Sequence, residues 1–249
     1  MRIVFFVTIL AFFSGWLVFS YQGHETISGA PPYGVSEVSS RTGSFPSLYN
    51  WKRPSGPAKV AIQVGHWQND SLPEELKMLR DNNGAQAGGV TEVQVNLKIA
   101  RLIASDLSDK GIEVEILPAT VPENYWSDVF LAIHADGSED KGKSGYKFAT
   151  SWRDTTRKAD QLINILKREY GPATNLQWDD NITKNMRGYY AFAWWRFDHA
   201  IHPMTTPVIL ETGFLTNTSD RNMLVKTSEI PADAISRGVL KYLQSENLI

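Results

Sequence analysis

The sequence predicts an α/β protein with an open, mostly parallel twisted sheet and helices on both faces of that sheet. Three observations lead to this fold. Short apolar runs of strand length alternate with longer amphipathic segments, which is typical of parallel strands connected by helices. The alternation is confined to residues 58–249, a length that suits a single domain. The apolar fraction of 42% and the charged fraction of 21% are those of a folded domain.

The amino terminus predicts a location outside the cytoplasm. Residues 3–19 form an apolar run without a charged side chain, and as a helix they would extend roughly 25 Å, less than the ~30 Å core of a bilayer. We predict that residues 1–20 are a signal peptide or, slightly favoured, a membrane anchor; a buried helix of the domain is the third interpretation. The first two make the protein extracytoplasmic, membrane-anchored or secreted to the cell envelope. Residues 21–57 are rich in Pro, Ser and Gly and predict a flexible linker.

The first two elements of the domain lie on either side of a long polar stretch. Residues 59–64 (KVAIQV) predict a short strand. Thr91 and Gln94 have the spacing of a capping box, and Glu92 places a carboxylate in the first turn of the helix that follows. Gly111 comes after the last turn. The helical spacing of its apolar residues predicts a core-facing stripe of Val93, Leu97, Ala100, Ala104 and Leu107.

Further segments continue the alternation of strands and helices. Strands are predicted at residues 112–117, 129–133, 146–149 and 207–210, and helices at residues 154–170 and 230–243. Two of these strands, VFLAI and PVIL, are apolar throughout, as in strands buried on both faces. In an open α/β sheet ligands bind outside the carboxyl ends of the strands, so the residues after these runs are the first candidates for chemistry.

Composition narrows the chemistry that these strand ends can support. The chain has no Cys and five His, which excludes disulfides, Cys-ligated zinc, iron–sulfur clusters and thiol nucleophiles. A total of 25 Lys and Arg against 27 Asp and Glu gives a net charge of −2. Basic residues are not in excess, so the composition does not predict nucleic-acid binding. Any metal ion would be held by His and carboxylate side chains.

Two imidazoles and two carboxylates fall where the strand ends should meet. His66 follows the first strand, His134 follows VFLAI, and Glu211 follows PVIL. Glu92 opens the helix that returns from the same edge of the sheet. Two His and one Glu around an open position are a common catalytic zinc shell, and a further Glu can act as the general base.

Spacing alone also leaves structural interpretations open. His66 or His134 could be a hydrogen-bonded loop histidine, and Glu92 could be an acidic residue stabilised by the helix dipole. Glu211 is harder to explain in this way, because a carboxylate directly after a buried strand is costly unless it is paired or functional.

Three segments of the domain have the character of family signatures: residues 84–100 (GAQAGGVTEVQVNLKIA), 132–136 (AIHAD) and 209–217 (ILETGFLTN). They resemble the signatures of the zinc-dependent N-acetylmuramoyl-L-alanine amidases, the third class of peptidoglycan amidases. Gly65-His66 resembles what remains of the first family motif, and Arg187-Gly188 resembles an Arg-Gly segment before the last core strand. The resemblance covers nearly the whole domain.

The resemblance implies a zinc-dependent hydrolase on an open α/β sheet. Matched residue by residue, it implies that His66, Glu92 and His134 bind Zn²⁺ and that Glu211 is the catalytic residue. The implied substrate is peptidoglycan or a muropeptide, cleaved at the amide between N-acetylmuramic acid and the L-alanine of the stem peptide. Glu211 would take a proton from water and deliver it to the leaving amine. A non-catalytic muropeptide-binding module on the same fold and another zinc peptidase are the alternatives.

Further residues are weaker candidates for substrate binding. The sequence departs from the family pattern by an insertion within residues 70–83, which borders the implied site. Trp67, beside the first ligand, is predicted to form a wall of the substrate cleft, and Arg187 is predicted to bind substrate. The aromatic run at residues 189–197 could line a groove, but its alternating members are better explained as the packing of a strand.

Overall fold

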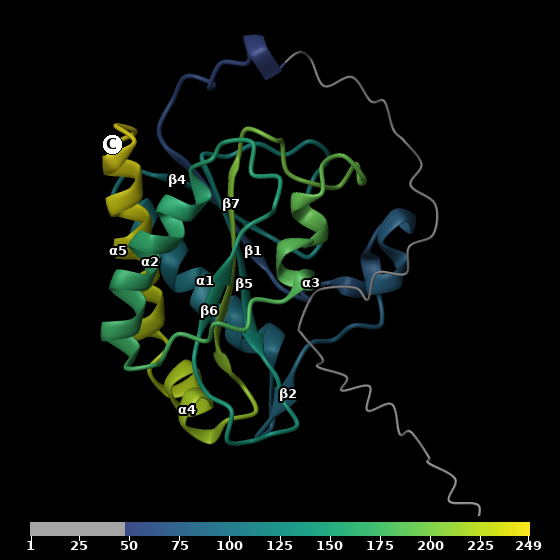
Figure 1. Ribbon diagram of the computed structural model, residues 1–249, viewed down its shortest axis with the longest axis vertical. Helices are drawn as coiled ribbons and strands as arrows, with labels where there is room; N and C mark the ends of the chain where they lie inside the picture. Colours follow the sequence, from purple (N-terminus) through teal and green to yellow (C-terminus); the bar gives the residue numbers. More distant parts are fainter. Residues whose placement is uncertain (1–47) are drawn as a thin grey trace, which may run out of the picture.

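A five-stranded sheet with the strand order β4-β1-β5-β7-β6 forms the centre of the structure, a computed structural model that describes residues 48–249 (Figure 1). The strands are β1 Lys59–Val64, β2 Gln86–Ala87, β3 Val90–Thr91, β4 Glu113–Leu117, β5 Val129–Asp136, β6 Lys147–Ala149 and β7 Thr206–Phe214. The α-helices are α1 Glu92–Ser108, α2 Ala159–Thr174, α3 Lys184–Arg187, α4 Thr218–Lys226 and α5 Glu229–Ser245. Short 3₁₀ helices occupy Leu48–Asn50, Asn69–Ser71, Glu74–Leu79 and Tyr190–Phe192. The segment predicted as a signal peptide or anchor, residues 1–20, and most of the predicted linker lie outside the described residues.

Neighbouring strands of the sheet run parallel except at one edge. β1 pairs in parallel with β4 and β5, and β5 pairs in parallel with β7. β6 pairs antiparallel with β7, because the chain reverses its direction in the loop between β5 and β6, a connection that needs no crossover helix. The predicted α/β fold with an open, mostly parallel sheet is confirmed.

The two strands that carry predicted site residues are longer than their apolar runs. β5 continues through His134 to Asp136, β7 continues through Glu211 to Phe214, and every residue of both strands is buried. The predicted strands end too early because an apolar run stops at its first ionisable residue. Backbone pairing continues beyond that point, since His134 and Glu211 are register partners. Both side chains therefore project from the sheet itself and not from loops after it.

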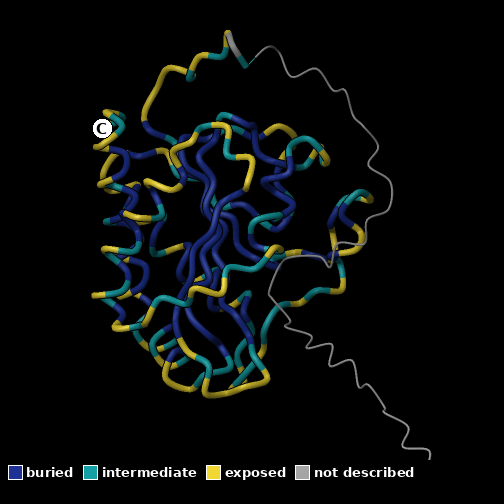
Figure 2. The backbone as a smooth tube through the Cα atoms, in the orientation of Figure 1, coloured by how far each residue is buried: buried dark blue, intermediate teal, exposed yellow. Residues whose placement is uncertain are grey.

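The strands contribute alternate residues to two hydrophobic cores. Ile62, Leu131 and Leu210 belong to the core shared with α1, α2 and α5, the long helices that lie together on one side of the sheet (Figure 1). Ala132 and Ile209 belong to a second core, which includes residues of α3 and of the 3₁₀ helices. Figure 2 shows the buried strands between these layers. Helices cover both faces as predicted, but the long ones all cover the same face.

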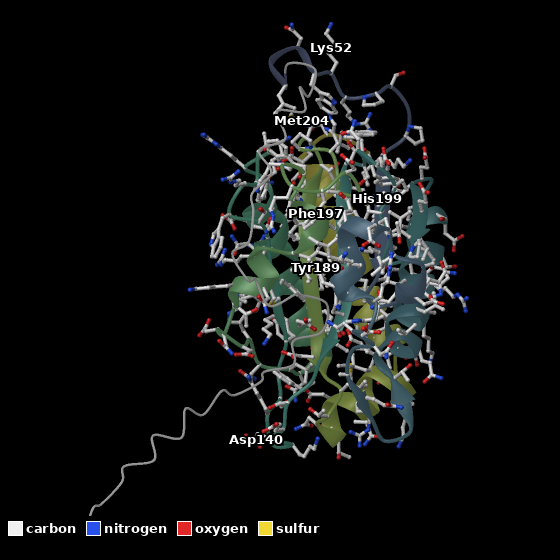
Figure 3. All side chains as sticks on the ribbon, turned by 90° about the vertical axis from the view of Figure 1, so that its right-hand side faces the viewer. Lys52, Asp140, Tyr189, Phe197, His199 and Met204 are labelled. Carbon is white, nitrogen blue, oxygen red and sulfur yellow. The ribbon has the colours of Figure 1, made fainter. Side chains whose placement is uncertain are left out.

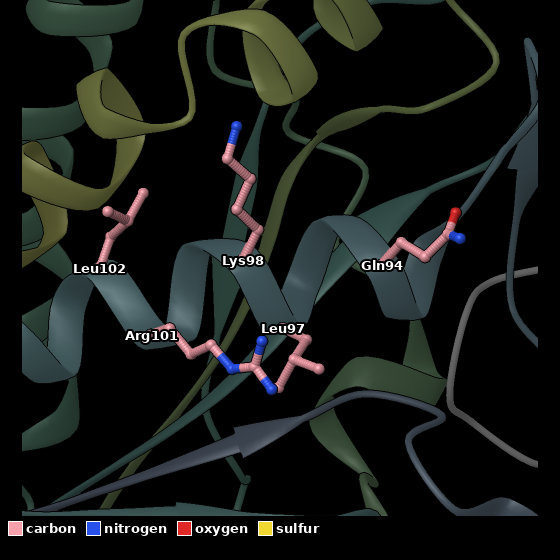
Figure 4. Close-up of a pocket in the computed structure, with 5 residues that line it drawn as sticks. All are labelled: Gln94, Leu97, Lys98, Arg101 and Leu102. Carbon is pink, nitrogen blue, oxygen red and sulfur yellow. The ribbon is translucent and has the colours of Figure 1, made fainter.

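Helix α1 begins as predicted but turns a different side to the core. Thr91 is its N-cap, and the side chains of Thr91 and Gln94 complete the capping box. Val93, Leu97 and Ala104 of the predicted stripe are only half-buried, and Figure 4 shows Leu97 in a groove on the surface of the helix. The buried stripe consists of Glu92, Val95, Asn96, Ile99, Ala100, Ile103 and Leu107. The helix is rotated because two polar residues of this stripe point inward, toward the site described below.

The later helices differ from their predicted bounds. The helix expected at residues 154–170 begins at Ala159 and continues to Thr174. Before it, a carboxylate oxygen of Asp154 accepts a hydrogen bond from the N–H of Ala159 at 3.0 Å, so the expected first turn is a hydrogen-bonded loop. The closing helix is present as α5, while α4 has no counterpart in the prediction because its apolar residues are too few to form a stripe.

The carboxyl end of the predicted linker contacts the domain. Arg53 donates hydrogen bonds to both carboxylate oxygens of Asp128, at 2.6 and 2.7 Å. Trp51 stacks on His202, with ring centroids 5.7 Å apart. These contacts attach the chain to the amino end of β5. Within residues 48–249, no helix combines the length and the apolarity that crossing a bilayer requires.

Candidate metal centre and active site

The three residues predicted as metal ligands meet at the carboxyl end of the sheet. His66 follows β1, Glu92 is the first residue of α1, and His134 lies in β5. One ligand atom of each lies within 4.8 Å of the others, and all three residues are buried. Oε1 of Glu92 is 3.6 Å from Nε2 of His66 and 3.0 Å from Nδ1 of His134. Residues from a helix, a strand and the turn after another strand thus form one cluster of donors.

The chain turns sharply after β1 and directs His66 into this cluster. His66 has a left-handed backbone conformation, with φ of 63°, and its Nδ1 lies 2.6 Å from the carbonyl oxygen of Asn82. A carbonyl only accepts hydrogen bonds, so Nδ1 carries the hydrogen and Nε2, which faces Glu92, keeps its lone pair. The Asn69 amide also donates to the carbonyls of Asn82 and Leu79. These bonds hold the Asn82 carbonyl in place beside His66.

Glu92 is oriented by donors around the start of α1. Its Oε1 accepts hydrogen bonds from the N–H of Ala135 and the side-chain amide of Asn96, both at 3.2 Å. Its Oε2 accepts a hydrogen bond from the N–H of Ala85 at 2.7 Å. The amino end of a helix also favours negative charge. Glu92 is therefore held with one oxygen directed at both imidazoles.

His134 is fully buried between the other two ligands and the second core. Burial lowers the pKa of His134 below its ordinary value, although Glu92 acts in the opposite direction. The neutral imidazole is the form that binds metal ions. While Nδ1 faces Glu92, Nε2 lies 3.3 Å from the hydroxyl of Tyr189.

Two glycines, which have no side chain, make room for the side chains of the three predicted ligands. A Cβ atom on Gly65 would lie 2.2 Å from Cε1 of the His134 ring. A Cβ atom on Gly84 would lie 2.4 Å from Oε2 of Glu92 and 2.7 Å from Cδ2 of His66, and Gly84 has a φ of +72°, which other residues rarely adopt. Any larger residue at these positions would displace a ligand.

Glu211 lies opposite His134 on the neighbouring strand. The two residues are register partners in the pairing of β5 with β7. Glu211 is 1% exposed, and neither of its carboxyl oxygens has a hydrogen-bond partner within the described part of the chain. Burial raises the pKa of Glu211 well above its ordinary value, and Asp136 and Glu92 act in the same direction. A buried carboxyl without partners is costly, so this arrangement points to a functional group.

A buried lysine on the edge strand lies on the other side of Glu211. Lys147 of β6 is also a register partner of Glu211, and its Nζ lies 2.6 Å from Asp136 and 3.2 Å from Asp179. Burial lowers the pKa of Lys147, but these carboxylates outweigh burial and raise it above its ordinary value. The sequence pattern contains no signal for this residue, since a lysine in an edge strand usually faces solvent.

The donor set fits a zinc ion. Two imidazole nitrogens and one carboxylate oxygen are the protein ligands of many catalytic zinc sites, in which the fourth position stays open. Each imidazole has a second hydrogen-bonding partner, the Asn82 carbonyl for His66 and the Tyr189 hydroxyl for His134. Such outer partners are usual for histidines that bind metal ions.

Comparisons with known proteins show the family of the chain. The profile of the N-acetylmuramoyl-L-alanine amidase family matches residues 60–241, most of the chain. The chain belongs to this family. The N-acetylmuramoyl-L-alanine amidase LytC of Bacillus subtilis (strain 168) is 26% identical over 209 residues, which cover 77% of this chain and 36% of LytC. This chain thus spans little more than a third of the length of that relative.

Solved structures of amidases share the fold. Ami1 from Mycobacterium smegmatis is similar with a TM-score of 0.57 and 16% identity, covering 76% of this chain and 97% of that one. An N-acetylmuramoyl-L-alanine amidase from Clostridium difficile 630 gives a TM-score of 0.53 and 18% identity, covering 77% and 99% of the two chains. At these identities the likeness establishes the fold of this amidase-family domain.

The two residues predicted to bind substrate are not members of the cluster. Trp67 is half-buried and packs against the core on the side of the long helices, and its carbonyl accepts a hydrogen bond from the N–H of Ala119 at 2.9 Å. Arg187 is half-buried at the end of α3. Their contribution to substrate binding stays a prediction.

The aromatic run after α3 is not a strand, so the expectation of strand packing is wrong. Its residues form the 3₁₀ helix Tyr190–Phe192 and turns, and Tyr189, Tyr190 and Phe192 are buried in the second core. Aromatic residues at every second position can occur in a compact turn that covers a sheet as well as in a strand, so the pattern does not distinguish the two. Tyr189, labelled at the centre of Figure 3, reaches His134 from this segment, a role that the alternation did not reveal.

The insertion of this amidase-family domain is packed against the second core. Three of its residues are buried there: Leu72, Leu76 and Leu79. Glu75 accepts hydrogen bonds from the main-chain N–H groups of Asp198 and His199 at 3.1 and 2.9 Å. The insertion thus forms a fixed wall beside the site.

A groove of about 460 Å³ begins where the insertion ends. It is lined by residues 81–86 and, across from them, by residues after β5 that include Ser138, Glu139 and Lys141. Its walls include Asn82 and Ala85, whose main chains form hydrogen bonds with His66 and Glu92. In Figure 3, Asp140 marks this end of the molecule and Lys52 marks the opposite end.

Proposed function

We propose that the protein hydrolyses the amide between the lactyl group of N-acetylmuramic acid and the L-alanine of the stem peptide in peptidoglycan, using a zinc ion held by His66, Glu92 and His134. Membership of the amidase family supports the reaction, and the buried His-Glu-His cluster supports the metal. The observation that carries the proposal is Glu211, a buried carboxyl without a hydrogen-bond partner in the described residues, directly across from His134.

Each side chain has a separate part in the proposed reaction. Zinc, when bound by the three ligands, supplies Lewis acidity, which polarises the scissile carbonyl and makes water more acidic. Glu211 accepts the proton of the attacking water and delivers it to the nitrogen of the leaving amine. Burial raises the pKa of Glu211 above its ordinary value, which makes its carboxylate a stronger base toward water. Lys147 acts in the opposite direction and favours the carboxylate, the form that begins the cycle.

The groove beside the insertion is the proposed path of the substrate to the site. It runs along the main chain that supports two of the ligands, and it carries charges of both signs at Glu139 and Lys141. A peptide stem with carboxylate and amine groups suits such a lining. The substrate would thus approach from the end of the molecule opposite Lys52.

The substrate sets the place of action. Peptidoglycan lies outside the cytoplasmic membrane, so a cell-wall amidase acts there. The apolar run at residues 3–19 provides a way to reach that location, either as a signal peptide or as a membrane anchor. The membrane is then a second partner, besides peptidoglycan, for the anchored form.

Zinc content combined with digestion of purified peptidoglycan tests the proposal. Free stem peptides together with glycan that lacks peptides, identified by mass spectrometry, are the expected products. Cleavage inside the stem peptide would instead indicate another zinc peptidase. Binding of muropeptides without any cleavage, by protein loaded with zinc, would contradict hydrolysis and favour a binding module. A His134→Ala variant should lose both zinc and digestion.

A further inference from the structure

A chain of buried hydrogen bonds leads from the ring of His134 into the second core. Nε2 of His134 lies 3.3 Å from the hydroxyl oxygen of Tyr189, and that hydroxyl lies 2.7 Å from the amide oxygen of Gln63. The amide nitrogen of Gln63 donates to the carbonyl of Ala119 at 2.9 Å. His134, Tyr189 and Gln63 are each 1% exposed or less. Bulk water therefore does not compete for these groups.

The direction of each hydrogen bond in this chain is fixed from its far end. The carbonyl of Ala119 can only accept, so the NH₂ group of Gln63 must face it. Tyr190 accepts from the same NH₂ group and donates to the same carbonyl, which reinforces this orientation. The amide oxygen of Gln63 then accepts the hydrogen of the Tyr189 hydroxyl. The Tyr189 oxygen is left to accept from Nε2 of His134, which therefore carries the ring hydrogen.

We infer that Tyr189 and Gln63 are positioning residues that hold His134 in the tautomer able to bind a metal ion through Nδ1. With the hydrogen on Nε2, the lone pair of Nδ1 faces Oε1 of Glu92 at 3.0 Å. Two acceptor atoms at this distance repel each other unless a cation or a proton lies between them. The inference rests on the proposed zinc site, but it concerns the position of one hydrogen and not the cleavage of the amide.

The other histidine of the site has the opposite arrangement. Nδ1 of His66 donates to the Asn82 carbonyl at 2.6 Å, and Nε2 faces Glu92. One imidazole thus offers Nε2 and the other offers Nδ1 to the same ion. This difference provides an internal control, because loss of the Tyr189 hydroxyl should affect His134 alone.

Long-range ¹H–¹⁵N NMR spectra of the imidazoles in the zinc-loaded full chain test the tautomers. We expect the hydrogen of His134 on Nε2 and the hydrogen of His66 on Nδ1. A hydrogen on Nδ1 of His134, with zinc bound through Nε2, would overturn the inference and leave the proposed zinc site intact. A wild-type chain that takes up no zinc would overturn the inference together with the proposed function.

The zinc affinities of three variants show whether Tyr189 and Gln63 orient His134 or only stabilise the fold. Tyr189→Phe removes the hydroxyl and keeps the ring, and Gln63→Met removes the acceptor of that hydroxyl at similar length. Tyr242→Phe is the matched control, because its buried hydroxyl bonds only Thr206 in the described residues, at 3.1 Å, on the side of the long helices. Competition with a chromophoric chelator measures the affinities.

Tyr189→Phe and Gln63→Met should each weaken zinc binding about 10- to 100-fold, while Tyr242→Phe should bind zinc like the wild type. Wild-type affinity in Tyr189→Phe would overturn the inference, and so would equal losses in Tyr189→Phe and Tyr242→Phe. If Tyr189→Phe does not fold, Gln63→Met decides by the same criteria.

Discussion

Nδ1 of His134 lies 3.0 Å from Oε1 of Glu92 in a part of the structure where both side chains are completely buried. Water cannot separate the two atoms, and Nε2 of His66 lies 3.6 Å from the same oxygen. A divalent cation among the three atoms would satisfy all of them at once. The free energy of unfolding should therefore depend on zinc.

Zinc is expected to raise the melting temperature of the protein. At a free concentration 100 times its Kd, zinc adds about 2.7 kcal/mol to the free energy of unfolding, or roughly 5–10 °C in Tm for a domain of this size. Calorimetry before and after chelation measures the shift. His66→Ala should abolish it. An undiminished shift in His66→Ala would show that zinc binds elsewhere.

Gly65→Ala is expected to impair zinc binding by displacing the His134 ring. The added Cβ atom would lie 2.2 Å from Cε1 of that ring, and a fully buried ring has little room to retreat. Zinc affinity should fall at least about 10-fold, in line with other perturbations of metal ligands. Gly142→Ala, in an exposed loop where the nearest atom is a flexible Asp140 oxygen, is the control. Equal zinc affinities in the two variants would contradict the steric role of Gly65.

The ion pairs between α2 and α5 should make part of the stability depend on pH. Lys241 and Arg237 lie 2.6 and 3.1 Å from Glu169, and the Lys241 hydrogen bond, with Arg237 adding to it, holds the pKa of Glu169 below its ordinary value. A depressed carboxyl pKa stabilises the fold above the unfolded pKa, and this contribution is lost as the pH falls through the folded value.

Glu169→Gln should therefore lower the free energy of unfolding at pH 7 by up to about 1 kcal/mol, since the cations are largely exposed. The difference from wild type should shrink as the pH falls below the ordinary carboxyl pKa of about 4.3, and it should disappear below the lower folded-state pKa of Glu169. Urea titrations at several pH values measure it. Glu123→Gln, at an exposed position without an ion pair in the described residues, should show no such dependence. A constant difference at all pH values would refute the electrostatic explanation.

Most of the fold could be predicted from the sequence because its signals are local. The apolar runs of β5 and β7 and the capping box at Thr91 depend on neighbouring residues only. The orientation of α1 could not be predicted, because its apolar residues occupy a broad arc. The side that is buried depends on Asn96, a polar residue that turns inward to donate to Glu92. Asn96 bonds a residue of its own helix, and it is the hydrogen bonds of Glu92 with the N–H groups of Ala85 and Ala135 that exist only once the site has formed.

The part of the candidate site that the order and direction of the strands bring together could be predicted from the sequence. His66 and His134 lie at the same edge because β1 and β5 are parallel neighbours. The supporting residues were not predictable, since Tyr189 and Lys147 reach the site from a turn and an edge strand that lack a distinctive pattern. Their function depends on long-range packing, which spacing along the chain does not encode.

In the proposed reaction, Glu211 transfers the proton beside a zinc ion that it does not bind. Glu211→Gln tests this most directly, because the amide has the shape of the carboxyl but cannot accept the proton. We expect the variant to retain the zinc content of the wild type and to lose at least about 10²- to 10⁴-fold in the rate of stem-peptide release from peptidoglycan. Digestion at the wild-type rate, or loss of zinc together with activity, would contradict the role assigned to Glu211.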